Sequence, residues 1–175
     1  MTDADPLYND WIHQQLRVQP DALAVHDLTD NRAFSWRQFN ERVDALAQRL
    51  CDDGIKVGDR IAYLGLNSSD VVEIFFATVR IGAVYVPLNF RLTSPELSFI
   101  IGDCTPSAVF YDQSFQTVVD EIDSVVMPDI VVASALDGTD SAYEKFFSGN
   151  GTSVAPAAAN ADTLSMIMYL SLIHI

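Results

Sequence analysis

Short apolar segments of strand length alternate with amphipathic segments of helix length through most of this 175-residue chain. The apolar segments lie at 60–66, 83–87, 107–111 and 130–133. Continuously apolar strands are typical of parallel sheets that are covered on both faces. Because crossovers between parallel strands are right-handed, this order predicts an α/β fold with a doubly wound, mostly parallel sheet and helices on both faces.

Two capping boxes mark where helices begin. Ser35 with Gln38, and Thr93 with Glu96, have the spacing in which the cap side chain binds the third helical amide and the third side chain reaches back. The first helix is predicted to end at Gly54, where a left-handed residue fits, and the second to end at Gly102. The inward stripe of the first helix is Phe39, Val43, Leu46, Ala47 and Leu50.

The helix between the first two central strands begins at a serine cap, Ser68 or Ser69, and ends at Gly82. We expect its inward residues to be Val72, Phe75, Phe76 and Val79. A further helix is predicted at 115–125 and a short one at 143–147.

The two ends of the chain have weaker patterns. We expect an opening helix at 7–18, followed by a hairpin of the strands 22–26 and 33–36. Residues 148–161 are rich in Gly, Ser, Ala, Pro and Asn and are interpreted as a linker, after which 164–169 is a final strand candidate.

The charge of the chain limits its partners. A formal net charge of -14 and a pI near 4.2 repel nucleic acid and anionic lipid surfaces. The apolar run 71–88 contains Glu73 and Arg80, which a membrane-spanning helix would have to bury, so no transmembrane segment is expected. Since the acidic N-terminus is unlike a signal peptide, we expect a cytoplasmic protein.

Four ordered segments resemble the acyl-CoA synthetase branch of the adenylate-forming, AMP-dependent synthetases. The segments are FSW with FNER (34–36, 39–42), GIKVGDRIA (54–62), NSSD (67–70) and RIGAVYVPLNFRL (80–92). The last, followed by PEL at 95–97 and Asp103-Cys104, is the most specific. The resemblance covers residues 1–169 and implies the first, incomplete part of the large N-terminal domain of such an enzyme.

The resemblance implies an AMP-forming acid–thiol ligase. In the family a carboxylate attacks the α-phosphate of Mg-ATP to give an acyl-adenylate, and the thiol of CoA then displaces AMP. ATP, Mg and CoA are therefore the cofactors expected of an intact enzyme, and a carboxylic acid, with fatty acids the leading class, is the expected substrate.

The last six residues depart from the family pattern. The strand 164–169 normally leads into a Thr/Ser/Gly-rich phosphate loop with a lysine, whereas LSLIHI at 170–175 has neither glycine nor lysine. Two explanations remain: a natural short protein, or an incomplete reading frame ending in a non-family tail at 170–175, which we favour. Without the loop and the small C-terminal domain, we expect no catalysis and no productive cofactor binding by this chain.

Few residues are candidates for a site. Arg91 matches a position where relatives look to use an arginine near the nucleotide phosphate of CoA, although a surface arginine before a helix is equally compatible. Ser171 is a weak candidate as a remnant of the phosphate loop. His13, His26 and His174 lack partners at metal-ligand or triad spacing, so no metal site and no catalytic residue are predicted.

A second hypothesis is a non-catalytic binding module derived from the same fold. A sheet that stops within a domain leaves an edge unpaired, and such an edge can bind a partner or self-associate.

Overall fold

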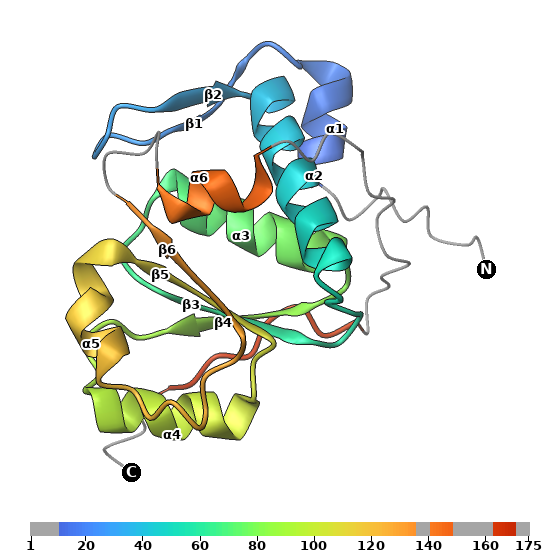
Figure 1. The fold of residues 1–175 in the computed structure, drawn as a ribbon. Helices are drawn as coiled ribbons and strands as arrows, with labels where there is room; N and C mark the ends of the chain where they lie inside the picture. Colours follow the sequence, from blue (N-terminus) through green and yellow to red (C-terminus); the bar gives the residue numbers. More distant parts are fainter. Residues whose placement is uncertain (1–10, 136–140, 149–162, 171–175) are drawn as a thin grey trace.

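The computed structural model describes residues 11–135, 141–148 and 163–170. At its centre is a parallel sheet of four strands in the order β4-β3-β5-β6, consisting of β3 (Arg60–Leu64), β4 (Val84–Leu88), β5 (Ala108–Asp112) and β6 (Ile130–Ser134). Helices cover both faces of this sheet (Figure 1). The predicted α/β fold class is therefore confirmed.

The upper face of the sheet in Figure 1 carries α2 (Trp36–Asp52), α3 (Ser69–Arg80) and α6 (Ala142–Phe147). The lower face carries α4 (Ser94–Cys104) and the short α5 (Gln116–Asp120). Successive strand residues point to opposite faces, so Ile61 and Tyr63 enter the upper core while Ala62 and Leu64 enter the lower one. This alternation gives the sheet two separate apolar cores.

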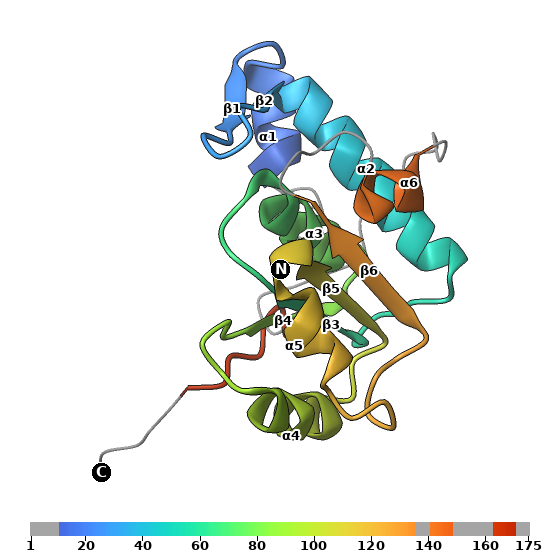
Figure 2. The ribbon, with the colours of Figure 1, turned by 60° about the vertical axis from the view of Figure 1, so that its left-hand side comes forward.

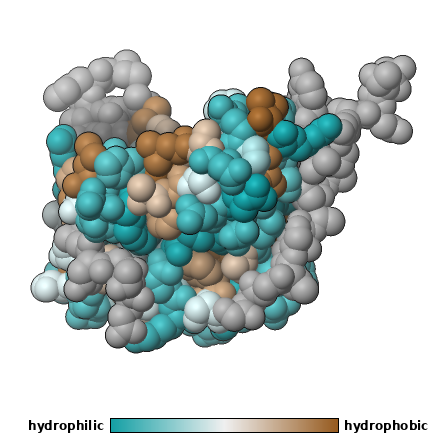
Figure 3. Space-filling model, turned by 90° about the horizontal axis from the view of Figure 1, so that it is seen from above, coloured by the Kyte–Doolittle hydropathy of each residue, from teal (hydrophilic) through white to brown (hydrophobic). Residues whose placement is uncertain are grey.

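A small antiparallel hairpin lies beside α2, with β1 (Leu23–His26) paired to β2 (Ala33–Ser35). The helix α1 (Trp11–Val18) packs against the same part of α2 (Figure 2). The predicted hairpin is confirmed, and residues 7–10 of the predicted opening helix lie outside the described residues. Seen from above the view of Figure 1, the surface is mostly hydrophilic, with separate hydrophobic patches (Figure 3).

Both capping boxes form as predicted. The Ser35 side chain accepts from the Gln38 amide, and the Glu96 carboxylate accepts from the Thr93 amide at 2.8 Å. The α2 helix ends at Asp52 and Gly54 follows with φ of 90°, a conformation that favours glycine.

Two predicted helix ends were wrong. Helix α4 continues past Gly102 to Cys104, and Thr105 adopts the left-handed conformation instead. Gly102 serves packing, because a Cβ there would lie 3.2 Å from Val126 Cγ1. The segment predicted as one helix at 115–125 is a 3₁₀ turn (Gln113–Phe115) and the five-residue α5. Beyond it, the Asp123 carboxylate accepts from the Val125 amide in a local turn that competes with helix.

The predicted inward stripe of α3 was only partly correct, since Val72, Phe75 and Phe76 pack against the upper core without being fully buried. Its fully buried apolar residues are Ile74 and Ala77, while the four residues that were predicted to point inward are only half-buried. The buried face of α3 also contains Asp70, Glu73 and Arg80. Apolar residues surround this helix on most sides, so periodicity alone did not identify the face that carries buried charges.

The segment 163–170 lies along the outer edge of β4, where the strand predicted at 164–169 would join the sheet. It forms a single parallel bridge between Met166 and Tyr85, with the Tyr85 amide donating to Ser165 O and the Ile167 amide to Tyr85 O, both at 2.9 Å. The strand predicted at 164–169 is thus reduced to one bridge. Of the predicted linker at 148–161, residues 149–161 lie outside the described residues.

Candidate functional site

Ligands of open α/β sheets bind at the carboxyl ends of the strands, where neighbouring strands connect in opposite directions. From β3 the chain crosses to β4 through α3, and from β5 it crosses to β6 through α5 on the other face. Since β3 and β5 are adjacent, the carboxyl ends of these two strands form that switch point. This crevice is the first place to look for a site.

The crevice at the switch point is nearly closed. Its cavity of about 10 Å³ holds at most one water molecule. A Cβ on Gly65 would lie 2.6 Å from Tyr63 Oη and 2.8 Å from Asp112 Cβ, so only glycine fits there without a shift. The lining includes four aspartates, Asp27, Asp30, Asp70 and Asp112, against one arginine, Arg32. An acidic, closed crevice is unsuited to a nucleotide phosphate.

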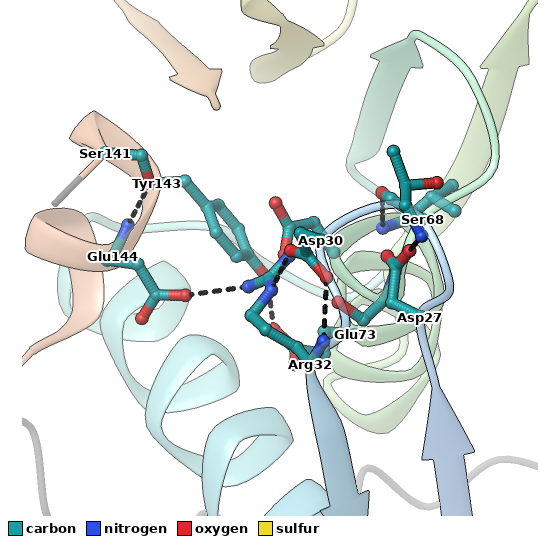
Figure 4. A network of polar contacts seen from close by, with 12 residues as sticks. Asp27, Asp30, Arg32, Ser68, Glu73, Ser141, Tyr143 and Glu144 are labelled. Carbon is teal, nitrogen blue, oxygen red and sulfur yellow. Dashed lines mark hydrogen bonds and ion pairs between the residues drawn. The ribbon is translucent and has the colours of Figure 1, made fainter. Parts of the chain in front are cut away.

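A network of ion pairs and hydrogen bonds around the buried Glu73 and Tyr143 lies next to the crevice (Figure 4). Arg42 on α2 donates from Nε to Glu73 Oε1 at 2.6 Å and from Nη1 to Glu144 Oε2 at 3.0 Å. Tyr143 on α6 donates its hydroxyl to Glu73 Oε2 at 3.0 Å. The network therefore fastens α6 to α2 and α3 through Glu73 on α3.

Arg32, which follows the β1–β2 turn, extends this network towards the switch point. Its Nη2 donates to Asp70 Oδ1 at 2.8 Å and its Nη1 to Glu144 Oε1 at 3.3 Å, and its Nε contacts Asp30. Asp27 accepts from the Ser69 amide at 2.7 Å, which ties the hairpin to the start of α3.

The pKa values in the network follow from its burial and its charges. Burial raises the pKa of Glu73 to about 7, although the hydrogen bonds and charge of Arg42 act against this rise. Burial lowers the pKa of Arg42, but its bonds to Glu144 and Glu73 outweigh that effect and raise it above the ordinary value. Complete burial raises the pKa of Tyr143 as well. We interpret the network as structural, because its donors and acceptors already bind one another.

The carboxyl end of β4 is the more open region. A groove there is lined by Asn89 and Leu92, by the first turns of α4 including Glu96 and Phe99, and by Tyr169 and Leu170. Tyr169 donates its hydroxyl to Asp103 Oδ2 at 2.5 Å, which fixes the segment 163–170 against α4. This groove is where the chain that follows β4 and the end of the described chain meet.

Arg91 lies in the turn between β4 and α4, next to this groove, and its side chain is exposed. The Arg91 amide donates to Asn89 Oδ1 at 3.0 Å, and its guanidinium lies over the Phe90 ring at 5.6 Å. Ser171 and His174 lie outside the described residues. His26 contacts Asn31 Oδ1 at 3.1 Å, and His13 is half-buried on α1.

Within the described ranges, no group of three or more His, Cys, Asp or Glu side chains is arranged to hold a metal ion. Both cysteines are free thiols. Across residues 11–135, 141–148 and 163–170, none of the helices has both the length and the apolar character that a membrane crossing requires.

The sequence did not identify the buried network, whose main members are Arg42, Glu73, Tyr143 and Glu144. One available signal was the pair of charged residues, Glu73 and Arg80, inside an otherwise apolar helix. Such charges require buried partners. The partners of Glu73 include Arg42 and Tyr143, and Arg80 binds Asp44, so the pairing could not be deduced from neighbouring residues.

Comparison with known proteins identifies the family. The family model described as AMP-binding enzyme matches residues 12–171. A long-chain-fatty-acid–CoA ligase of Mycobacterium tuberculosis is 32% identical over 160 residues, which is 91% of this chain and 31% of that protein. A feruloyl-CoA synthase from an Amycolatopsis species is 39% identical over 101 residues, covering 58% of this chain and 20% of the relative.

Solved structures agree with this assignment. The N-terminal domain of FACL13 from Mycobacterium tuberculosis superposes with a TM-score of 0.81 at 29% identity, over 91% of this chain and 40% of that structure. The chain thus spans between 20% and 31% of the length of the curated relatives described above. The motifs of residues 34–92 had indicated the same family. The chain belongs to the AMP-binding family of adenylate-forming enzymes.

Proposed function

We propose that this chain supplies the first part of the adenylating domain of a carboxylic acid–CoA ligase. The single observation that carries the proposal is the similarity to a long-chain-fatty-acid–CoA ligase along 91% of the chain. In the proposed reaction a carboxylate oxygen attacks the α-phosphorus of Mg-ATP, and the bond to pyrophosphate breaks. The thiol of CoA then attacks the acyl carbon, AMP leaves, and the thiol proton is released.

Fatty acids are the proposed substrate class, since the relative that acts on long-chain fatty acids matches 160 residues. Aromatic acids are the competing class, because a feruloyl-CoA synthase and an indoleacetate–CoA ligase also match. The segments that shape an acyl pocket lie mostly beyond this region in the family. The substrate class therefore rests on overall similarity and not on identified pocket residues.

Within this function, Arg91 is proposed to bind a phosphate of the CoA nucleotide. Its guanidinium is exposed and has no ion-pair partner among the described residues, so its N–H groups are available to phosphate oxygens. Because the net charge of -14 repels anions, a phosphate group would need a local cation such as Arg91 to bind this chain.

A chimera tests this proposal. Residues 12–169 would replace the corresponding region of the Mycobacterium tuberculosis ligase, and pyrophosphate release and acyl-CoA formation would be measured with fatty, ferulic and indoleacetic acids. We expect activity with long-chain fatty acids. In the chimera, Arg91→Ala should raise the KM for CoA while pyrophosphate release in the adenylation step stays unchanged. A folded chimera that forms no acyl-adenylate with any of these acids would contradict the proposed function.

The 175-residue chain alone is proposed to be inactive, because the crevice at the switch point is nearly closed and is lined by four aspartates and one arginine, which does not suit a triphosphate. The interpretation of 170–175 as a non-family tail stays a prediction. Pyrophosphate release by the purified chain with ATP, Mg and a fatty acid would contradict this part of the proposal.

A non-catalytic binding module is the second candidate, and exposed apolar side chains favour it. Phe99 is 73% exposed, Leu170 69% and Met168 57%, and Phe99 and Leu170 line the groove beside β4. Strand β6 pairs only with β5 among the described residues, so its other edge is a possible self-association site. A concentration-independent monomer in sedimentation experiments would argue against self-association at either surface.

A further inference from the structure

Arg91 differs from most cationic side chains of this protein in what holds it. Many of the other arginines are engaged by carboxylates or carbonyl oxygens. Ion pairs to aspartate or glutamate are formed by Arg32, Arg37, Arg42, Arg49 and Arg80. Arg60 instead donates to backbone carbonyls, including Cys104 O at 2.8 Å. Rings also contact Arg32, Arg42 and Arg49, in addition to their ion pairs. Among the described residues, the Arg91 guanidinium contacts the ring of Phe90 and forms no ion pair.

The nearest carboxylate in the sequence after Arg91 is already occupied. Glu96 Oε2 accepts from both the amide and the hydroxyl of Thr93 at 2.8 Å, and these bonds lower the pKa of Glu96. The capping box therefore engages Glu96, the acidic side chain in the first turn of α4, together with the Thr93 amide. Arg91 is left as the cation that faces solvent at the carboxyl end of β4.

The Phe90 ring is itself supported by a ring that follows β5, the next strand along the chain. Its centroid lies 6.1 Å from that of Phe115, which follows β5, and the two planes are tilted by 54°. Phe115 packs against the lower core, whereas Phe90 is 41% exposed. The Asn89 side chain accepts from the Arg91 amide and so fixes the turn that presents both residues. We call Phe90 and Phe115 the aromatic ledge.

A contact with an aromatic face has a specific consequence for a guanidinium. An ion pair uses the in-plane N–H donors, but a ring below the plane is attracted to the cation without using them. The in-plane donors of Arg91 thus stay free to bind two phosphate oxygens at once.

We propose that Phe90 is a positioning residue: the aromatic ledge holds the Arg91 guanidinium over its ring so that the N–H donors face an incoming phosphate. This inference rests on the proposed phosphate-binding role of Arg91 and adds the residue that orients it. The ligand class is a nucleoside phosphate, in the proposed reaction that of CoA.

The experiment uses the whole chain and adenosine 3′,5′-bisphosphate, with adenosine as the phosphate-free control. The Arg91 Nε–H resonance is followed by NMR during each titration. In the unmodified chain we expect saturable shifts with the bisphosphate and none with adenosine. Because an exposed cation–π contact is weak, Phe90→Leu should weaken bisphosphate binding by about two- to fivefold. Phe90→Tyr, which keeps a ring face, should restore most of the affinity.

Matched variants separate positioning from a general structural effect. Trp11→Leu removes an exposed ring on α1, away from the groove, and should leave the affinity unchanged. In an Arg91→Ala background, Phe90→Leu should cause no further loss, and circular dichroism should show equal folding of all variants.

The possible outcomes are distinct. If Phe90→Leu binds as tightly as the unmodified chain while Arg91→Ala does not bind, the ledge has no positioning role and the proposed role of Arg91 stands. If the unmodified chain shows no saturable shift at Arg91, both the phosphate site and its positioning residue are wrong. A loss that is as large in the Arg91→Ala background would also overturn the positioning role.

Discussion

The two sheet ends that could hold a ligand differ in how their arginines are used. At and beside the switch point between β3 and β5, Arg32 and Arg42 form ion pairs with carboxylates, and the crevice has room for a single water molecule. At the carboxyl end of β4, Arg91 lies on an aromatic ring beside an open groove. Arg32 and Arg42 also lie over aromatic rings, but their N–H groups bind carboxylates, whereas Arg91 has a ring contact and no ion pair among the described residues. An arginine bound by carboxylates stabilises the fold, whereas one without such partners can bind an external anion. Four predictions test this contrast.

The largest effect is expected at Arg42. Arg42→Ala would leave Glu73 fully buried without its ion-pair partner, and breaking a buried pair in this way costs about 3–5 kcal/mol. Urea denaturation at pH 8 measures the loss. As a control, Arg37→Ala removes an exposed pair with Asp21 and should cost about 0–1 kcal/mol. Equal losses in the two variants would show that the buried network has no special role.

The second largest effect on stability is expected at Gly65, beside the closed crevice. Gly65→Ala would place a methyl group against Tyr63 and Asp112, and overpacking of this kind costs about 1–3 kcal/mol. Gly102→Ala is the matched control, since only the Val126 side chain must shift there and alanine favours the helix by up to about 1 kcal/mol. Thermal unfolding of the two variants should separate them. If Gly65→Ala matched the unmodified protein, the crevice would be more open than described.

The buried Glu73 predicts a pH dependence. Burial raises its pKa from 4.5 in the unfolded chain to about 7 in the folded one, so the native state binds the additional proton between these values. Its contribution to the free energy of unfolding is therefore fully present below about pH 4.5 and is lost as the pH rises to about 7. Glu73→Gln should remove this contribution, which has a slope of at most about 1.4 kcal/mol per pH unit.

Urea denaturation at several pH values between 4.5 and 8 measures that slope. Glu121→Gln, at an exposed carboxyl, serves as the control and should leave the slope in place. An identical pH dependence in Glu73→Gln and the unmodified chain would contradict the assignment.

The smallest effect on stability is expected at Arg91. Arg91→Ala should change the free energy of unfolding by less than about 0.5 kcal/mol, because the side chain is exposed and makes no ion pair among the described residues. The same substitution is expected to weaken binding of the bisphosphate. A stability loss similar to that of Arg42→Ala would show that Arg91 is structural, and the contrast between the two regions would fail.

Several elements could be predicted from the sequence because their causes are local. The capping boxes at Ser35 and Thr93 and the left-handed Gly54 depend on residues within one helical turn. The parallel strands could be predicted because continuous apolar runs require cover on both faces. The end of α4 was predicted wrongly because Gly102 serves a tertiary contact, the space for Val126, that local sequence does not reveal.

The candidate site was less predictable. Arg91 was a candidate through the family resemblance, but its contact with Phe90 and the support of Phe115 depend on two neighbouring loops of the folded sheet. The network was missed because Glu73 and Glu144 lie 31 and 102 residues after Arg42 in the sequence. No periodicity indicates which distant charges will meet.

The sequence by itself determined the alternating α/β order, the helix starts and the family, since these follow from local hydrogen bonding, apolar patterning and ordered motifs. The tertiary structure alone decided which arginines bind carboxylates and that Arg91 remains available at the carboxyl end of β4. The reason is physical: burial makes a charge depend on partners that only the folded chain brings within hydrogen-bonding distance.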